Sequence, residues 1–110
     1  MLGAIIGDVV GSIYEFNNHR SKEFDIYTEG MSFTDDTVMT AAVAEWLMLT
    51  DRSMAKLEDT MVYWGKQYGG AGYGNRFYCW LFLPRALGYG DKRVPYNSFG
   101  NGSAMRVSAV

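Results

Sequence analysis

The sequence predicts an all-α protein with a single domain over residues 1–110. Apolar residues recur at intervals of three and four in successive segments, which is the period of a helix. No segment alternates polar and apolar residues with the period of a strand. Hydrophobic residues make up 48% of the chain, which is typical of a protein with a packed core and not of a disordered one. The length is that of one domain.

Charge and composition exclude several classes of function. The net charge of -2 provides no basic surface for nucleic acid. The apolar start, MLGAIIGDVVGSIYEF, has no basic leader and reaches Asp8 and Glu15 before the roughly 20 residues that a bilayer span needs. Cys79 is the single cysteine, which fits a reducing compartment. We therefore expect a cytoplasmic protein that binds neither nucleic acid nor a membrane.

The first expected element is a helix at the amino terminus, whose apolar stripe comprises Leu2, Ile5, Ile6, Val9 and Ile13. Gly3, Gly7 and Gly11 recur at intervals of four, so another backbone or a ligand is expected to come close. Asp8, Ser12 and Glu15 share one stripe. The pattern predicts a polar line along an otherwise buried helix, followed by a polar connection over residues 17–33.

Four further helices are expected. The second begins at Thr34 and the third is capped by Ser53. The glycine-rich stretch 68–75 ends the third helix, and a fourth runs from about Arg76 to Pro84. A last helix begins near Ser103. The inward-facing residues are expected to be Met39, Ala42, Val43, Trp46 and Leu49 in the second helix, Met54, Leu57, Met61, Trp64 and Tyr68 in the third, and Phe77, Trp80 and Leu81 in the fourth.

The stretch FTDDTVMT, residues 33–40, places two adjacent carboxylates at the start of the second helix. One interpretation is local: Thr34 caps the helix, and Asp35 and Asp36 face the positive end of its dipole. The other is a site for a hard metal, because a hydroxyl and two carboxylates supply part of the oxygen shell that magnesium prefers. A softer metal is not expected, since His19 and Cys79 stand far apart. The stretch alone leaves both interpretations open.

The stretch NSFGNGSAMR, residues 97–106, also has two interpretations. Glycines beside a helix start let an anion such as phosphate approach backbone N–H groups, and Arg106 adds a positive charge. An ordinary turn with Ser103 as the helix cap explains the same residues. The spacing matches neither a P-loop nor a dinucleotide-binding fingerprint.

Four stretches occur in one order along the chain: GDVVGSIYEF (7–16), FTDDTVMT (33–40), YGNRFYCWL (73–81) and NSFGNGSAMR (97–106). This set resembles the ADP-ribosylglycohydrolase family, which includes the dinitrogenase reductase-activating glycohydrolases. The resemblance spans nearly the whole chain, and its second and fourth motifs are the most specific. It favours the metal interpretation of the acidic pair over a cap alone.

The resemblance implies an all-α fold around two magnesium ions, or manganese in their place, that binds ADP-ribose. Family enzymes hydrolyse the bond that joins ADP-ribose to a protein side chain or to another acceptor. By this resemblance, Thr34, Asp35 and Asp36 are metal ligands, and Glu15, Asp35 and Asp36 are catalytic. Asp8 is a supporting residue. The loop that cradles the diphosphate comprises Gly100, Asn101, Gly102, Ser103, Met105 and Arg106. Tyr73 and Tyr96 either stack on a base or ribose or belong to the core.

The chain departs from the family in one respect. The family's domain is more than twice as long, and its second half carries another acidic helix start that completes the metal shell. Residues 37–110 contain no match to it. The chain is therefore expected to be an amino-terminal fragment, a short form that associates with itself or with a complementary chain, or a relative without catalysis. Its function is then either ADP-ribosyl hydrolysis or that of an inactive ADP-ribose-binding or structural, partner-binding module.

Overall fold

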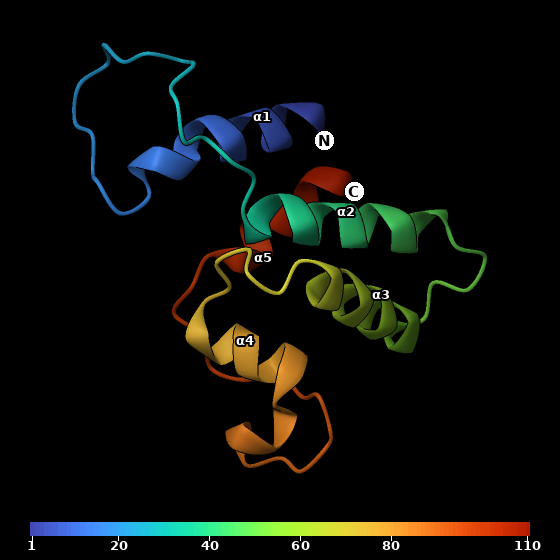
Figure 1. The fold of residues 1–110 in the computed structure, drawn as a ribbon. Helices are drawn as coiled ribbons and strands as arrows, with labels where there is room; N and C mark the ends of the chain where they lie inside the picture. The colour runs from blue at the N-terminus through green and yellow to red at the C-terminus, as the bar shows by residue number, and fades with distance from the viewer.

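The computed structural model describes residues 1–110 and contains helices without strands, which confirms the predicted fold class. The helices are α1 (Leu2–Gly11), α2 (Asp35–Met48), α3 (Met54–Gln67), α4 (Asn75–Phe82) and α5 (Gly102–Arg106), and the short 3-10 turns are η1 (Ser12–Tyr14), η2 (Pro84–Leu87) and η3 (Val107–Ala109). In Figure 1, α2 and α3 lie side by side, and the connection between α1 and α2 extends as a long loop. No helix is long and apolar enough to cross a bilayer.

Helix α2 is the centre of the fold, because α1, α3, α5 and η3 all pack against it. The buried core joins α2 to α3 and α4 and comprises Val38, Met39, Ala42, Met61, Tyr73 and Leu81. The buried hydroxyl of Thr40 donates a hydrogen bond of 3.2 Å to the carbonyl of Met105. This bond holds the carboxyl-terminal segment against α2, 65 residues away in the sequence.

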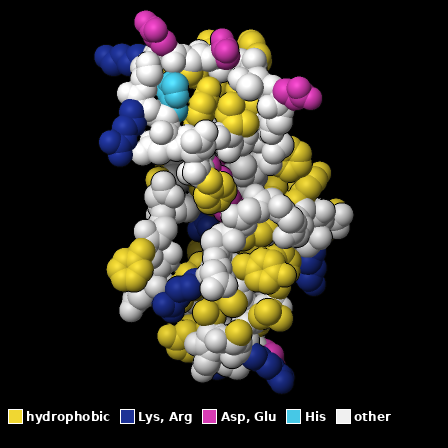
Figure 2. All heavy atoms as spheres, turned by 60° about the vertical axis from the view of Figure 1, so that its left-hand side comes forward, with side chains coloured by type: hydrophobic (Ala, Val, Ile, Leu, Met, Phe, Trp, Pro, Cys, Tyr) yellow, Lys and Arg dark blue, Asp and Glu magenta, His cyan; other side chains and the backbone are white.

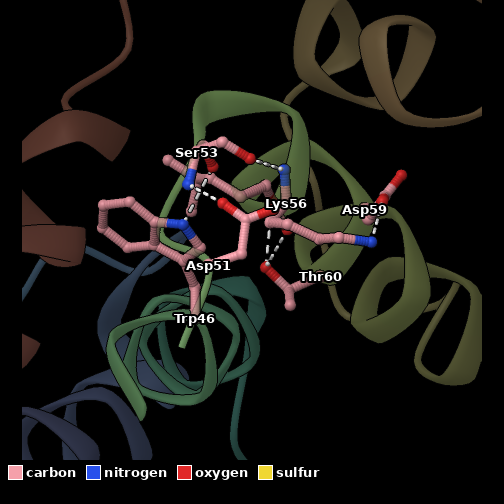
Figure 3. Close-up of polar contacts among 7 residues, drawn as sticks. Trp46, Asp51, Ser53, Lys56, Asp59 and Thr60 are labelled. Atoms are coloured by element: carbon pink, nitrogen blue, oxygen red, sulfur yellow. Dashed lines mark hydrogen bonds and ion pairs between the residues drawn. The ribbon is translucent and has the colours of Figure 1, made fainter. Parts of the chain in front are cut away.

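The connection from α2 to α3 is held by local hydrogen bonds (Figure 3). The Ser53 hydroxyl accepts from the Lys56 backbone N–H at 3.4 Å, so Ser53 caps α3 as predicted. The Asp51 carboxylate accepts from the Ser53 N–H at 2.9 Å, and the Trp46 indole donates to the Ser53 carbonyl at 3.0 Å. These contacts fix the α2–α3 pair at the end opposite to the acidic start of α2.

Helix α1 is not the buried element that its apolar stripe predicts. None of its residues is buried, and Leu2 and Ile6 are 73% and 56% exposed. Two residues of the polar line face inward instead, whereas Glu15 is exposed. Asp8 accepts hydrogen bonds from the start of α2, and the Ser12 hydroxyl accepts from the Ser32 N–H at 3.2 Å. Because Asp8 and Ser12 form these hydrogen bonds, their side of α1 faces the rest of the molecule. Part of the apolar stripe is therefore exposed to solvent.

The glycines of α1 have no backbone neighbour. A Cβ placed at Gly3, Gly7 or Gly11 would meet no atom within 4 Å, so the predicted close approach of another chain segment is absent. Gly65 on α3 behaves differently, because its Cβ would lie 3.2 Å from Leu81 Cδ1. The absence of a side chain at Gly65 therefore lets α4 pack closely against α3.

The last two helices differ slightly from the sequence prediction. Helix α4 begins at Asn75 and ends at Phe82, and of its expected inward residues Leu81 is fully buried while Phe77 and Trp80 pack half-buried against the core. Helix α5 begins at Gly102, so Ser103 lies inside its first turn and is not the cap. Asn101 takes the cap position without a side-chain hydrogen bond, because the turn before α5 places its backbone there.

Replacing Leu81 by alanine is expected to lower the free energy of unfolding by about 2–5 kcal/mol, because Leu81 is fully buried where α4 meets α3. Leu83→Ala is the matched control, since Leu83 is 53% exposed at the end of the same helix and its loss is expected to cost about 1 kcal/mol or less. Urea unfolding followed by circular dichroism measures both. Equal losses for the two variants would contradict the packing described here.

Candidate functional site

One groove of about 1420 Å³ gathers residues from four separate parts of the chain. Its walls are α1, the start of α2, the glycine-rich turn before α4, and the segment from Pro95 to Arg106. All the residues that the sequence proposed for a site line it: Glu15, Thr34, Asp35, Asp36, Gly100, Asn101, Gly102, Ser103, Met105 and Arg106. Figure 2 shows acidic side-chain atoms recessed in the middle of this face, between segments that project outward. The fold therefore brings the four motifs together.

The start of α2 positions the acidic pair. Thr34 is extended, and its hydroxyl accepts a hydrogen bond of 3.4 Å from the Asp36 N–H, so it occupies the cap position. The Asp35 N–H donates to the Ala71 carbonyl at 2.8 Å, which ties this helix start to the glycine-rich turn. The capping arrangement is therefore present, and both carboxylates still line the groove.

Asp8 of α1 holds this helix start from the other side. Its carboxylate accepts the backbone N–H groups of Thr34 at 2.8 Å and Thr37 at 3.1 Å. It also accepts both threonine hydroxyls, each at 2.5 Å. Hydrogen bonds to a charged acceptor are stronger than neutral ones, so this clamp is a firm link between α1 and α2. The sequence alone assigned Asp8 only a supporting role, and the structure shows what it supports.

The groove concentrates negative charge at its acidic end. Burial, followed by the neighbouring charges of Asp36 and Glu15, raises the pKa of Asp35 to about 6. Burial and the charge of Asp8 also raise the pKa of Asp36, whereas Arg106 lowers it. A cation beside these carboxylates would offset the part of each shift that comes from neighbouring negative charge, whereas burial is the largest single cause of both shifts.

The same groove also contains a cation, Arg106, whose charge lowers the pKa of Asp36. The guanidinium of Arg106 lies over the Phe77 ring, with its carbon 4.4 Å from the ring centre. A Cβ at Gly102 would lie 3.3 Å from the guanidinium, so glycine leaves the space that Arg106 occupies. The Nε of Arg106 is buried without a hydrogen-bond partner, and burial lowers the pKa of Arg106. A buried donor without an acceptor is suited to an anionic ligand.

Aromatic residues complete the walls. Tyr73 is only 9% exposed and packs edge-on against Phe77 and Phe82, so it belongs to the core. Tyr73 is also among the residues that line the groove. Its hydroxyl is buried without a hydrogen-bond partner, and burial followed by the charge of Asp35 raises its pKa to about 12. Tyr96 is half-buried, and the Arg76 guanidinium lies 5.7 Å from its ring. The sequence did not single out Arg76; its place directly after a glycine-rich turn is the signal that points to it.

The donor atoms at the acidic end fit part of a magnesium shell. They are a threonine hydroxyl and two carboxylates, all oxygen, from residues that line the groove. No group of three or more His, Cys, Asp or Glu side chains is arranged to hold an ion. His19 bonds to the Glu23 carbonyl in the α1–α2 connection, and Cys79 lies on α4. The chain therefore supplies an incomplete, oxygen-only shell.

The raised pKa of Asp35 predicts a pH-dependent stability. Because its folded pKa of about 6 exceeds the ordinary value of 3.8, the folded state holds the proton more tightly, and stability falls as pH rises between these values. Asp35→Asn removes this term, so without divalent cations the variant is expected to be more stable than the wild type above pH 6, by on the order of 1 kcal/mol after solvent screening, and nearly equal at pH 4. Urea unfolding from pH 4 to 7 measures the difference, with exposed Asp59→Asn as the control. A difference that does not change with pH would refute the expectation.

Comparison with known proteins identifies the family of the chain. No curated protein and no solved structure matches the chain. The family model described as ADP-ribosylglycohydrolase matches residues 1–110, which include the acidic helix start, the glycine-rich turn and the loop before α5. This match covers every wall of the groove, and the predicted resemblance is confirmed. The chain belongs to the ADP-ribosylglycohydrolase family.

Proposed function

We propose that the groove binds the ADP-ribose unit of an ADP-ribosylated protein or small molecule and takes part in hydrolysing its glycosidic bond with two magnesium ions, or manganese in their place. The observation that carries the proposal is the convergence of all the motif residues on one groove, which contains both carboxylates and the Arg106 guanidinium. ADP-ribose has groups that match both kinds of residue, since its ribose hydroxyls suit hard cations and its diphosphate suits cationic and N–H donors.

The residues would divide the work by their chemistry. Thr34, Asp35 and Asp36 would hold the cations, which when bound supply Lewis acidity toward ribose hydroxyls and water. The loop from Gly100 to Ser103, together with Arg106, would hold the diphosphate. Glu15 would place negative charge near the positive charge that develops on the ribose as the bond breaks, by analogy with other glycosidases.

Exposed apolar side chains outside the groove favour association with another chain. Only 10 of the 110 residues are buried, so large apolar side chains such as Leu2, Ile6 and Val110 are exposed. Exposed apolar patches mark interaction surfaces, and a neighbouring chain is also a source of further carboxylates for the incomplete metal shell. We include in the proposal a second copy or a complementary chain as partner, and a cytoplasmic location consistent with the single cysteine.

The hydrolysis is tested by release of ADP-ribose from an ADP-ribosylated protein in the presence of Mg²⁺. Asp35→Asn and Asp36→Asn are each expected to lower the rate by at least about tenfold, because each removes a cation ligand. Asp59→Asn is the control, since Asp59 is exposed on α3 and outside the groove. If the acidic variants keep the wild-type rate, the metal assignment is wrong. If the wild type binds ADP-ribose without releasing it from substrate, the inactive binding module is the correct function.

Association is tested by light scattering of the purified chain. We expect a dimer or a larger assembly, and Ile6→Lys is expected to shift the mass toward the monomer, because Ile6 is an exposed apolar residue of α1. Lys56→Ala, on the exposed side of α3, is the control and is expected to leave the mass unchanged. A monodisperse wild-type monomer would contradict this part of the proposal.

A further inference from the structure

The clamp formed by Asp8 joins two threonines that face different surroundings. Thr34 lines the groove. Thr37, one turn later, lines a small apolar pocket on the other side with Phe33, Val38, Ala41, Trp64 and Tyr68. The same carboxylate therefore binds one hydroxyl beside the acidic end of the groove and one hydroxyl away from it. Because of this difference, variants of Thr34 and Thr37 can distinguish a role of Asp8 at the site from a role in folding.

The hydrogen bonds at Thr34 determine what its oxygen has left to offer. A threonine hydroxyl has one hydrogen and two lone pairs. The hydrogen is donated to Asp8 Oδ1 at 2.5 Å, and one lone pair accepts a long bond of 3.4 Å from the Asp36 N–H. The second lone pair has no partner within the chain. With its hydrogen held on the α1 side, the oxygen presents electron density, and not a proton, toward the groove.

We propose that Asp8 is a positioning residue that prepares Thr34 as a cation ligand by holding its hydroxyl hydrogen and its rotamer. Without Asp8, the hydroxyl hydrogen would turn to the nearest acceptors, the carboxylates that share the helix start, and the oxygen would lose its orientation. Ligand atoms at metal sites commonly depend on such outer hydrogen bonds, and their loss typically lowers affinity by 10–100-fold. This inference rests on the proposed function, because it assumes a cation at the acidic end.

The test measures binding of Mn²⁺ to the full chain by electron paramagnetic resonance, below the melting temperature of every variant. Asp8→Asn and Thr34→Val are each expected to lower Mn²⁺ affinity by about tenfold or more. Thr37→Val removes a hydroxyl bond to the same carboxylate away from the groove, so it is expected to lower the melting temperature but to leave the affinity within about twofold. The double variant Asp8→Asn/Thr34→Val is expected to bind no more weakly than the weaker single variant, because Asp8 acts through Thr34.

The outcomes distinguish the positioning role of Asp8 from the existence of the cation site. If the wild type binds Mn²⁺ and Asp8→Asn binds it as well as Thr37→Val does, the positioning role is wrong and the cation site stands. Multiplicative losses in the double variant would also overturn the positioning role, since Asp8 would then act independently of Thr34. A wild type that binds no Mn²⁺ overturns the cation site and this inference together. If Asp8→Asn does not fold, equal losses of affinity in Thr34→Val and Thr37→Val overturn it.

Discussion

The carboxylate of Asp8, bound to the first turn of α2, is the contact on which the site depends. Helix α1 has no buried residue, so burial of apolar surface alone holds it only loosely against the rest of the molecule. The four hydrogen bonds to Thr34 and Thr37 define its position instead. Because of this contact, Gly7 and Gly11 of α1 and Glu15, directly after η1, form one wall of the groove.

Helix α2 connects α1 to the other walls of the groove. Its first turn is bound to Asp8 and to the carbonyl of Ala71, and its middle is bound to Met105 through Thr40. Three segments that are distant in the sequence are therefore placed relative to one helix. A groove built in this way needs few buried residues, and small shifts of α2 would move all of its walls together.

The concentration of acidic groups has a cost for the isolated fold. Burial, followed by repulsion from neighbouring carboxylates, raises the pKa values of Asp35 and Asp36, so their ionised forms are less stable here than in water. Natural proteins accept such a cost where a site is to bind a ligand that offsets it. The Tyr73 hydroxyl and the Arg106 Nε are likewise buried without a hydrogen-bond partner in the chain, which adds to the cost of the isolated fold.

The sequence by itself determined the helices, the cap at Ser53, the cap position of Thr34 and the family, because these depend on local spacing and on motifs that are read along the chain. Only the tertiary structure decided which face of α1 is covered, that Tyr73 belongs to the core, and that Arg76 lies at the groove beside Tyr96. Periodicity shows that a helix has an apolar face but not what packs against it. The Asp8 hydrogen bonds span 26 to 29 residues, and no local pattern encodes the direction in which such a carboxylate turns.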